Sequence, residues 1–233
     1  MHAGESSTSA FPCIVPYDAQ TRAEWLQLTV PLEEYQDRLA RVRLEMAAQG
    51  LDALLVVGNH GEPSGIAYLT NFTPRFGTTW LLVPLDGEPV VVADGLLHGE
   101  PMHSVLWNVW LPDLRPAWPR PGKPPGAIAQ VLAGAARERG LASARIGVAS
   151  PAVISSAHAD ALRRELPNVT WADGTAALMR PRAIKSENEI ALMRRACEIT
   201  ALGLSAAEAA CLAGRTEREV ANIAHAAMFS GGA

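Results

Sequence analysis

The sequence predicts an α/β fold, in which a mixed sheet is flanked by helices and is followed by a purely helical C-terminal segment. Short apolar runs, such as residues 53–57, alternate with longer amphipathic stretches, which is the pattern of helices packed on a sheet. The chain has 233 residues, of which 48% are hydrophobic, so it can bury a sizeable core. From Ser186 onward two capped amphipathic stretches follow each other without a strand pattern.

Residues 1–30 form an N-terminal extension, since Pro12, Pro16 and the polar start argue against a regular element. A helix follows from Pro31, a residue suited to a first helical position, and ends at Gly50. Its apolar residues recur at helical spacing: Tyr35, Leu39, Val42 and Met46.

The centre of the chain reads as strands and helices in alternation. Residues 53–57 are a buried strand, 58–65 a loop and 66–69 a helical turn. Asp86 and Gly87 favour a hairpin between strands at 79–83 and 89–92. We then expect these further segments: a strand at 106–111, a proline-rich loop at 112–125, a helix at 127–139, a strand at 145–148, a helix at 156–166 and a strand at 169–172.

The C-terminal segment begins after a hinge that we place at residues 173–183, where Pro181 marks a stop. Ser186 with Glu189 and Thr216 with Glu219 are capping boxes that open two helices. The apolar stripes of these helices have no sheet to cover them, which predicts dimers or aggregates in solution.

The stretches IKSENEIALMRRACEI and GRTEREVA resemble the entry to the catalytic domain of the pita-bread metallopeptidases, the group of aminopeptidase P, prolidase and creatinase. The residues from about 32 to 173 resemble the N-terminal, creatinase-like domain of that family, which has a ribonuclease H-like sheet. The resemblance implies an extension at 1–30, the N-terminal domain at 31–175 and the first helices of a truncated pita-bread domain at 176–233.

The family's catalysis implies two divalent ions, such as Mn, Co or Zn, which share five side-chain ligands in the order Asp, Asp, His, Glu, Glu. All five would lie beyond Ala233, so we expect no catalytic residue, metal ligand or cofactor in this chain and no activity of the chain alone. Creatinase is a metal-free member of the same fold, so the parent could be either kind of hydrolase.

One loop resembles a family loop that reaches toward the active site of the neighbouring subunit in a dimer. It contains Arg75, Phe72 and Phe76, which the resemblance makes substrate contacts in trans. The planar guanidinium of arginine matches a substrate carboxylate. The commoner arrangement for such a loop is an arginine in solvent above two packed phenylalanines, and the sequence leaves both open.

Other chemistry is less well supported. His98 and His103, with Glu100 between them, have no rigid frame and no nearby thiol, so we assign no metal site there. Residues 58–65 lack the spacing of a phosphate-binding loop and read as a turn. The neighbouring residues at a predicted helix start read as a cap and not as a triad: Ser155, Ser156 and His158.

The formal charge of −4 gives no reason to expect nucleic acid or an anionic membrane as a partner. No secretory signal is recognisable, so a cytoplasmic location is the default.

The favoured function is the N-terminal part of an Xaa-Pro aminopeptidase- or dipeptidase-like hydrolase, which serves oligomerisation, as a homodimer, and substrate gating. A stand-alone binding or scaffold protein is the alternative. A nuclease is a third, which would need Asp52, Asp86 and Asp94 to converge on metal ions, and their places at the edges of different strands do not favour that.

Overall fold

The computed structural model describes residues 28–74, 77–93, 109–117 and 127–232. The chain divides into two compact units, one ending at Ala183 and the other starting at Ile184. The first unit thus includes residues 176–183, and the domain bounds that the family resemblance implies stay a prediction. No helix in the described ranges is long and apolar enough to cross a membrane.

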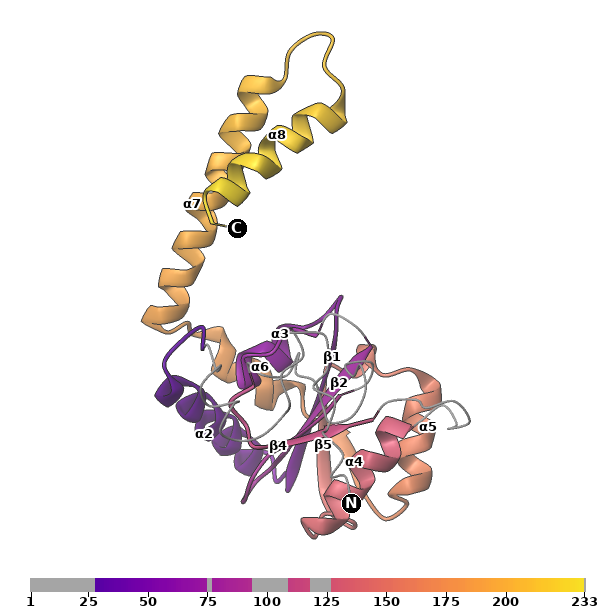
Figure 1. The fold of residues 1–233 in the computed structure, drawn as a ribbon. Coiled ribbons are helices and arrows are strands. Elements are labelled where there is room, and N and C mark those ends of the chain that lie inside the picture. The colour runs from indigo at the N-terminus through magenta and orange to yellow at the C-terminus, as the bar shows by residue number, and fades with distance from the viewer. Residues whose placement is uncertain (1–27, 75–76, 94–108, 118–126, 233) are drawn as a thin grey trace, which may run out of the picture. The chain divides into compact units, whose positions relative to one another are not determined.

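The first unit is built on a six-stranded mixed sheet with the strand order β4-β3-β2-β1-β5-β6 (Figure 1). The central strand β1 pairs antiparallel with β2 and parallel with β5. The strands are β1 (Ala53–Asn59), β2 (Thr78–Pro84), β3 (Val90–Ala93), β4 (Asp113–Pro116), β5 (Arg145–Ala149) and β6 (Thr170–Asp173).

Helices cover both faces of this sheet. One face carries α2 (Leu32–Ala48), α3 (Ser64–Thr70) and α6 (Thr175–Ala183); the other carries α4 (Ala127–Glu138), the short helix η1 (Pro151–Val153) and α5 (Ser156–Glu165) (Figure 1). The side chains of β1 alternate between the two cores, since Leu54 and Val56 lie in the first and Leu55 and Val57 in the second. A strand buried on both faces has no polar side, which is why its sequence is a continuous apolar run.

Most predicted elements are confirmed, but two segments differ. The loop predicted at 112–125 contains β4, which pairs parallel with β3, whereas residues 109–111 of the predicted strand 106–111 have no strand structure and 106–108 lie outside the described residues. The predicted hinge at 173–183 contains α6, and Pro181 lies inside that helix. Leu178 and Pro181 of α6 are buried and α6 packs on α2, so tertiary packing outweighs the cost of the proline.

The second unit is a hairpin of α7 (Glu187–Ala210) and α8 (Glu217–Ser230). Both predicted capping boxes are confirmed: the Ser186 Oγ accepts from the Glu189 N–H at 3.1 Å, and the Thr216 Oγ1 accepts from the Glu219 N–H at 3.3 Å. Gly203 lets the helices approach closely, because a Cβ there would lie 2.6 Å from the Met228 Cγ.

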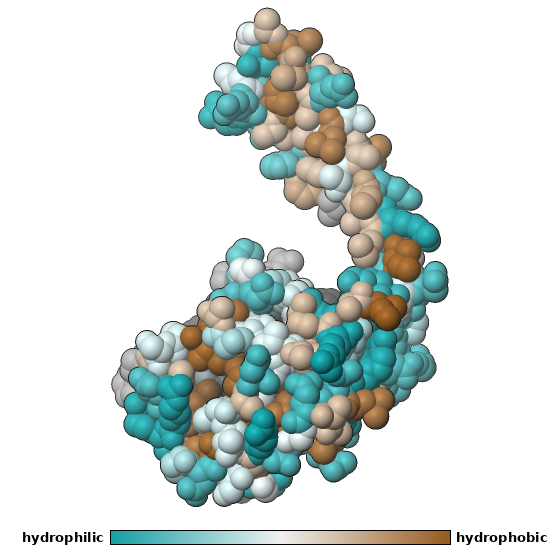
Figure 2. All heavy atoms as spheres, turned by 180° about the vertical axis from the view of Figure 1, so that it is seen from behind, coloured by the Kyte–Doolittle hydropathy of each residue, from teal (hydrophilic) through white to brown (hydrophobic). Residues whose placement is uncertain are grey.

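Large apolar side chains remain exposed on this hairpin, as the brown spheres of its surface show in Figure 2. They are Ile184, Leu192, Met193, Leu202, Leu204, Leu212 and Phe229. Cys197 and Cys211 are also exposed, and both are free thiols. The uncovered stripes predicted for this segment are therefore present, while self-association stays a prediction.

Candidate functional site

The turn after α3 leads into the loop that holds the predicted site residues. Asn71 ends α3 in the left-handed conformation, with φ 65°, which asparagine tolerates better than most residues. Its Oδ1 accepts hydrogen bonds from the Thr29 N–H at 3.1 Å, the Thr29 hydroxyl at 2.7 Å and the Tyr35 hydroxyl at 2.7 Å. One amide oxygen thus ties the segment before α2, and α2 itself, to this turn.

A buried arginine holds the same turn from α2. Arg38 is 4% exposed and its guanidinium lies 5.0 Å from the ring centroid of Tyr35 and 4.6 Å from that of Tyr68. It donates to the Tyr68 carbonyl oxygen at 3.1 Å and pairs with Glu34 at 2.5 Å. A cation at the C-terminal carbonyls of a helix is favourable because those carbonyls carry negative partial charge.

Burial also changes the pKa of the tyrosine hydroxyl in this cluster. Burial raises the pKa of Tyr35 above its ordinary value of 10.0, and the hydrogen bond with Thr29 opposes that rise. The neutral hydroxyl is therefore kept as a donor to Asn71 throughout the physiological pH range.

Two further bonds complete the base of the loop. The Trp110 indole N–H donates to the Leu69 carbonyl oxygen at 2.8 Å, and the Phe72 N–H donates to the Thr70 Oγ1 at 3.1 Å. Phe72 is 5% exposed and packs in the core, so it anchors the loop in this structure, while its substrate contact stays a prediction. Arg75 and Phe76 lie outside the described residues.

The polar residues of this base were not identified from the sequence. Tyr35 lies on the apolar stripe that predicts its helix, and Asn71 lies in the segment that resembles the family loop, so neither residue indicates a polar cluster by itself. The available signal was Arg38, which lies three residues after Tyr35 and so falls on the buried stripe, where a charged residue needs a partner.

The loop after β1 is a turn, as predicted. The Asn59 Oδ1 accepts from the N–H groups of Gly61 and Glu62, each at 2.9 Å. Gly58 is required by packing, because a Cβ there would lie 2.6 Å from the Ile66 Cγ1. These contacts account for the glycines and the asparagine without a phosphate.

The remaining candidates have local structural roles where the structure describes them. The Ser155 Oγ caps α5 by accepting from the His158 N–H at 3.3 Å, and the His158 ring packs edge-on against Trp80. The Asp52 Oδ2 accepts from the Arg145 N–H at 2.7 Å and so joins the starts of two strands. Asp94, His98, Glu100 and His103 lie outside the described residues.

No group of three or more His, Cys, Asp or Glu in the described ranges could hold a metal ion. These residues therefore do not fit the two divalent ions that the family resemblance implies, and we assign none of them a metal-binding role.

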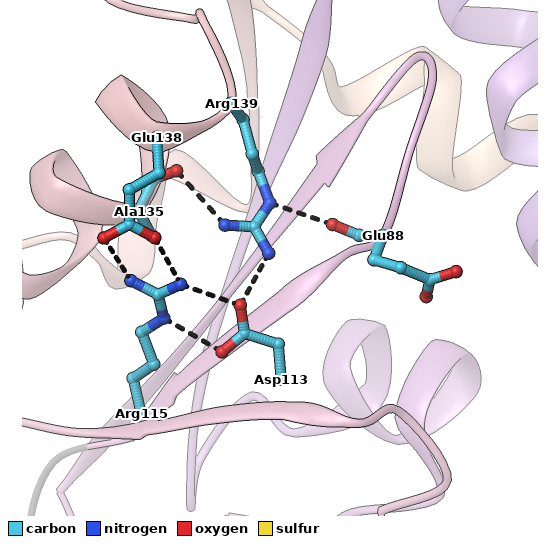
Figure 3. Close-up of polar contacts among 6 residues, drawn as sticks. All are labelled: Glu88, Asp113, Arg115, Ala135, Glu138 and Arg139. Carbon is cyan, nitrogen blue, oxygen red and sulfur yellow. Dashed lines mark hydrogen bonds and ion pairs between the residues drawn. The ribbon is translucent and has the colours of Figure 1, made fainter.

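An ion-pair network joins β4 to the C-terminal end of α4 at the β4 edge of the sheet (Figure 3). Arg115 donates to Asp113 and to Glu138 through two nitrogens each, and Arg139 donates to Asp113 at 2.6 Å and to the Glu88 carbonyl oxygen at 2.9 Å. Partial burial alone would raise the pKa of Asp113, but the hydrogen bonds from Arg115 and Arg139 outweigh it and hold that pKa below its ordinary value of 3.8. The charges are matched within the network, which makes it a structural clamp.

A cavity of about 230 Å³ lies at the other end of the sheet, between β5, β6, η1 and α5. Its lining is apolar apart from Arg163, and the members are Val148, Pro151, Ile154, Ala159, Leu162, Arg163 and Trp171. It is not adjacent to the turn after α3, which lies on the opposite face of the sheet.

The comparisons with known proteins agree with this fold. The family model for the creatinase/prolidase N-terminal domain matches residues 38–184. The ectoine hydrolase of Halomonas elongata is 33% identical over 190 residues, which are 76% of this chain and 44% of that protein. The creatinase of a Bacillus species is 30% identical over 212 residues, which are 87% of this chain and 46% of that protein. The chain thus spans about half the length of the curated relatives it matches.

Among solved structures, the X-Pro aminopeptidase of Thermotoga maritima superposes with a TM-score of 0.66 at 17% identity, over 84% of this chain and 49% of that one. The prolidase of Pyrococcus horikoshii superposes with a TM-score of 0.63 at 19% identity, over 84% and 49%. At these identities the likeness concerns the fold. The match of the family model to residues 38–184 shows that this chain belongs to the creatinase/prolidase N-terminal domain family.

Proposed function

We propose that the chain is the N-terminal part of an Xaa-Pro peptidase- or creatinase-like hydrolase, in which it serves oligomerisation and substrate gating. The loop carrying Arg75 would contact substrate bound to a neighbouring subunit. The observation that carries this proposal is the fixed base of that loop, where Asn71 is held by Thr29 and Tyr35. A substrate contact gains specificity only when the backbone that carries it is held in place.

The chemistry of the loop favours a substrate with a carboxylate. A guanidinium can form two parallel hydrogen bonds with a carboxylate, and such charge-assisted bonds are stronger than neutral ones. Phe72, which packs in the core just before Arg75, would fix the direction in which the loop leaves the domain. We place the working protein in the cytoplasm as a homodimer.

We further propose that residues 1–233 alone do not hydrolyse these substrates, because the resemblance assigns the catalytic groups to residues that follow α8. The purified chain would be incubated with manganese and either an Xaa-Pro dipeptide or ectoine. We expect no turnover above that of buffer. Turnover that a chelator abolishes would show that the chain contains a catalytic centre.

The gating role is tested in a polypeptide extended through the catalytic residues of the parent reading frame. Replacement of Arg75 by Ala should raise KM by roughly tenfold or more, the effect of losing a charge-assisted hydrogen bond, with a smaller change in kcat. Arg75→Lys should recover part of the loss. The matched control is Arg164→Ala on the exposed surface of α5, which should leave KM unchanged. An unchanged KM for Arg75→Ala would remove the proposed contact.

A stand-alone scaffold protein is the second candidate, and the exposed apolar side chains of α7 and α8 favour it as a surface for a partner. A stop codon directly after Ala233 in the gene, together with accumulation of the intact 233-residue protein, would support the scaffold over the hydrolase.

A further inference from the structure

The last strand of the sheet, β6, presents one free edge. It pairs with β5 on one side only and is the terminal strand of the sheet. The Thr170 N–H donates to Ala144 and the Gly174 N–H to Val148, so even-numbered residues of this stretch face β5. Because the pleat alternates, the backbone N–H and C=O groups of Trp171 and Asp173 face away from the sheet.

Both ends of β6 are open to solvent. Thr170 and Asp173 are exposed, and Trp171 and Ala172 are half-buried. In the part of the chain that the structure describes, no strand and no backbone hydrogen bond engages the outward groups. The other terminal strand, β4, ends at Pro116, which has no N–H to donate, and carries the charged network of Asp113 and Arg115. The β6 edge has neither proline nor lysine within it.

We propose that β6 pairs with β6 of a second copy of this chain, in an antiparallel register centred on Ala172. In that register Trp171 lies opposite Asp173 of the second copy, and each such pair exchanges both of its backbone hydrogen bonds. The small side chain of Ala172 lies on the two-fold axis, where opposed residues come closest. The two sheets would then form one continuous sheet across the dimer.

Charge complementarity selects a second copy as the partner. Trp171 and Arg163 line the same cavity, so the guanidinium lies on the face of the sheet to which the Trp171 side chain points. Opposed residues of an antiparallel pair project to the same face, which brings Asp173 of the second copy beside Trp171 and Arg163. The two-fold axis repeats this contact between Arg163 and Asp173. Within its own chain the 67% exposed side chain of Arg163 pairs with Asp160 at 3.1 Å, and the Asp173 Oδ1 accepts from the Thr175 N–H at 2.8 Å. The contact between copies would therefore use a further N–H of the guanidinium and the Asp173 Oδ2.

The same arrangement would also cover apolar surface at the cavity between β5, β6, η1 and α5. Trp171 of β6 is one of its lining residues, and a strand added along β6 would extend the sheet beside it. Covering apolar surface at the edge adds to the backbone hydrogen bonds, as in other cases where a strand is added to a sheet.

The first experiment is a charge exchange, read as the dissociation constant from sedimentation equilibrium of the full 233-residue chain. Arg163→Glu and Asp173→Lys should each weaken association about tenfold, because symmetry repeats the contact. The double variant should restore association to near the original value. Arg164→Glu is the matched control, since it makes the same charge change on α5 at a residue that does not line the cavity, and it should have no effect.

The second experiment measures backbone amide exchange as a function of protein concentration. The N–H groups of Trp171 and Asp173 should gain protection as the dimer forms, whereas those of Thr170 and Gly174, already bonded to the neighbouring strand, should be protected at every concentration. A dimer that protects only α7 and α8, or a charge exchange without recovery, would overturn the β6 interface while leaving the proposed homodimer intact. A monomer at all concentrations would overturn both.

Discussion

Replacing Asn71 tests whether one side chain holds the base of the candidate loop. Asn71→Ala removes an acceptor that three groups share and leaves the buried Tyr35 hydroxyl without this partner. The loss of the bonds with Thr29, the loss of the Tyr35 hydroxyl's acceptor on Asn71 and the strain of a left-handed alanine at φ 65° together amount to about 3 kcal/mol of unfolding free energy.

Two companion variants separate the causes. Asn71→Gly relieves the backbone strain but not the lost acceptor, so it should cost about 2 kcal/mol. Asn71→Asp keeps an acceptor in the same place and tolerates the left-handed region, so it should cost less than about 1 kcal/mol.

Tryptophan fluorescence during urea unfolding measures this series. All six tryptophans precede Ala183 in the sequence, so the signal reports on the first unit alone. If Asn71→Gly were as stable as the original chain, the side chain would contribute nothing and only the backbone would matter. If Asn71→Asp were as damaging as Asn71→Ala, the acceptor role would be wrong.

Two further predictions concern stability. Asp113→Asn should cost roughly 2 kcal/mol, because Arg139 loses its carboxylate partner and Arg115 keeps only Glu138. Since the folded pKa of Asp113 is lowered, its contribution is present above pH 3.8 and is lost as the pH falls through that lowered value. Acid titration of the unfolding free energy should therefore show a smaller slope in the variant. Gly203→Leu should separate α7 from α8 at a cost of about 1–3 kcal/mol of unfolding free energy. Circular dichroism would measure this loss, because the hairpin has no tryptophan. If the clash with Met228 is the cause, Met228→Ala in the same chain should recover part of the loss.

Local rules account for most of what the sequence predicted correctly. The capping boxes at Ser186 and Thr216 involve residues only three positions apart, and the strand at residues 53–57 is a continuous apolar run. Such patterns are complete within a short window, so they can be recognised before the fold is known.

The errors come from residues whose structure depends on distant partners. The strand at Asp113–Pro116 follows Pro112 and ends on a proline, and it pairs on one side only, with Val90–Ala93. The helix containing Pro181 is held by its packing on α2, including an ion pair of Arg180 with Glu45 at 3.0 Å. In both segments the prolines indicate a low propensity for regular structure. Tertiary contacts outweigh that low propensity, so a strand and a helix form there.

The base of the candidate loop could not be found from the sequence for the same reason. Asn71 is 42 residues from Thr29 and 36 from Tyr35, and only the packing of α2 beside α3 brings the three together. This distance has a functional consequence under the proposed function. A change in α2, such as Tyr35→Phe, removes a hydrogen bond from the turn but touches neither substrate nor catalytic groups. It should therefore weaken substrate binding through the position of the loop, with kcat less affected than KM. A pure loss of stability would instead lower the amount of active protein and leave KM unchanged.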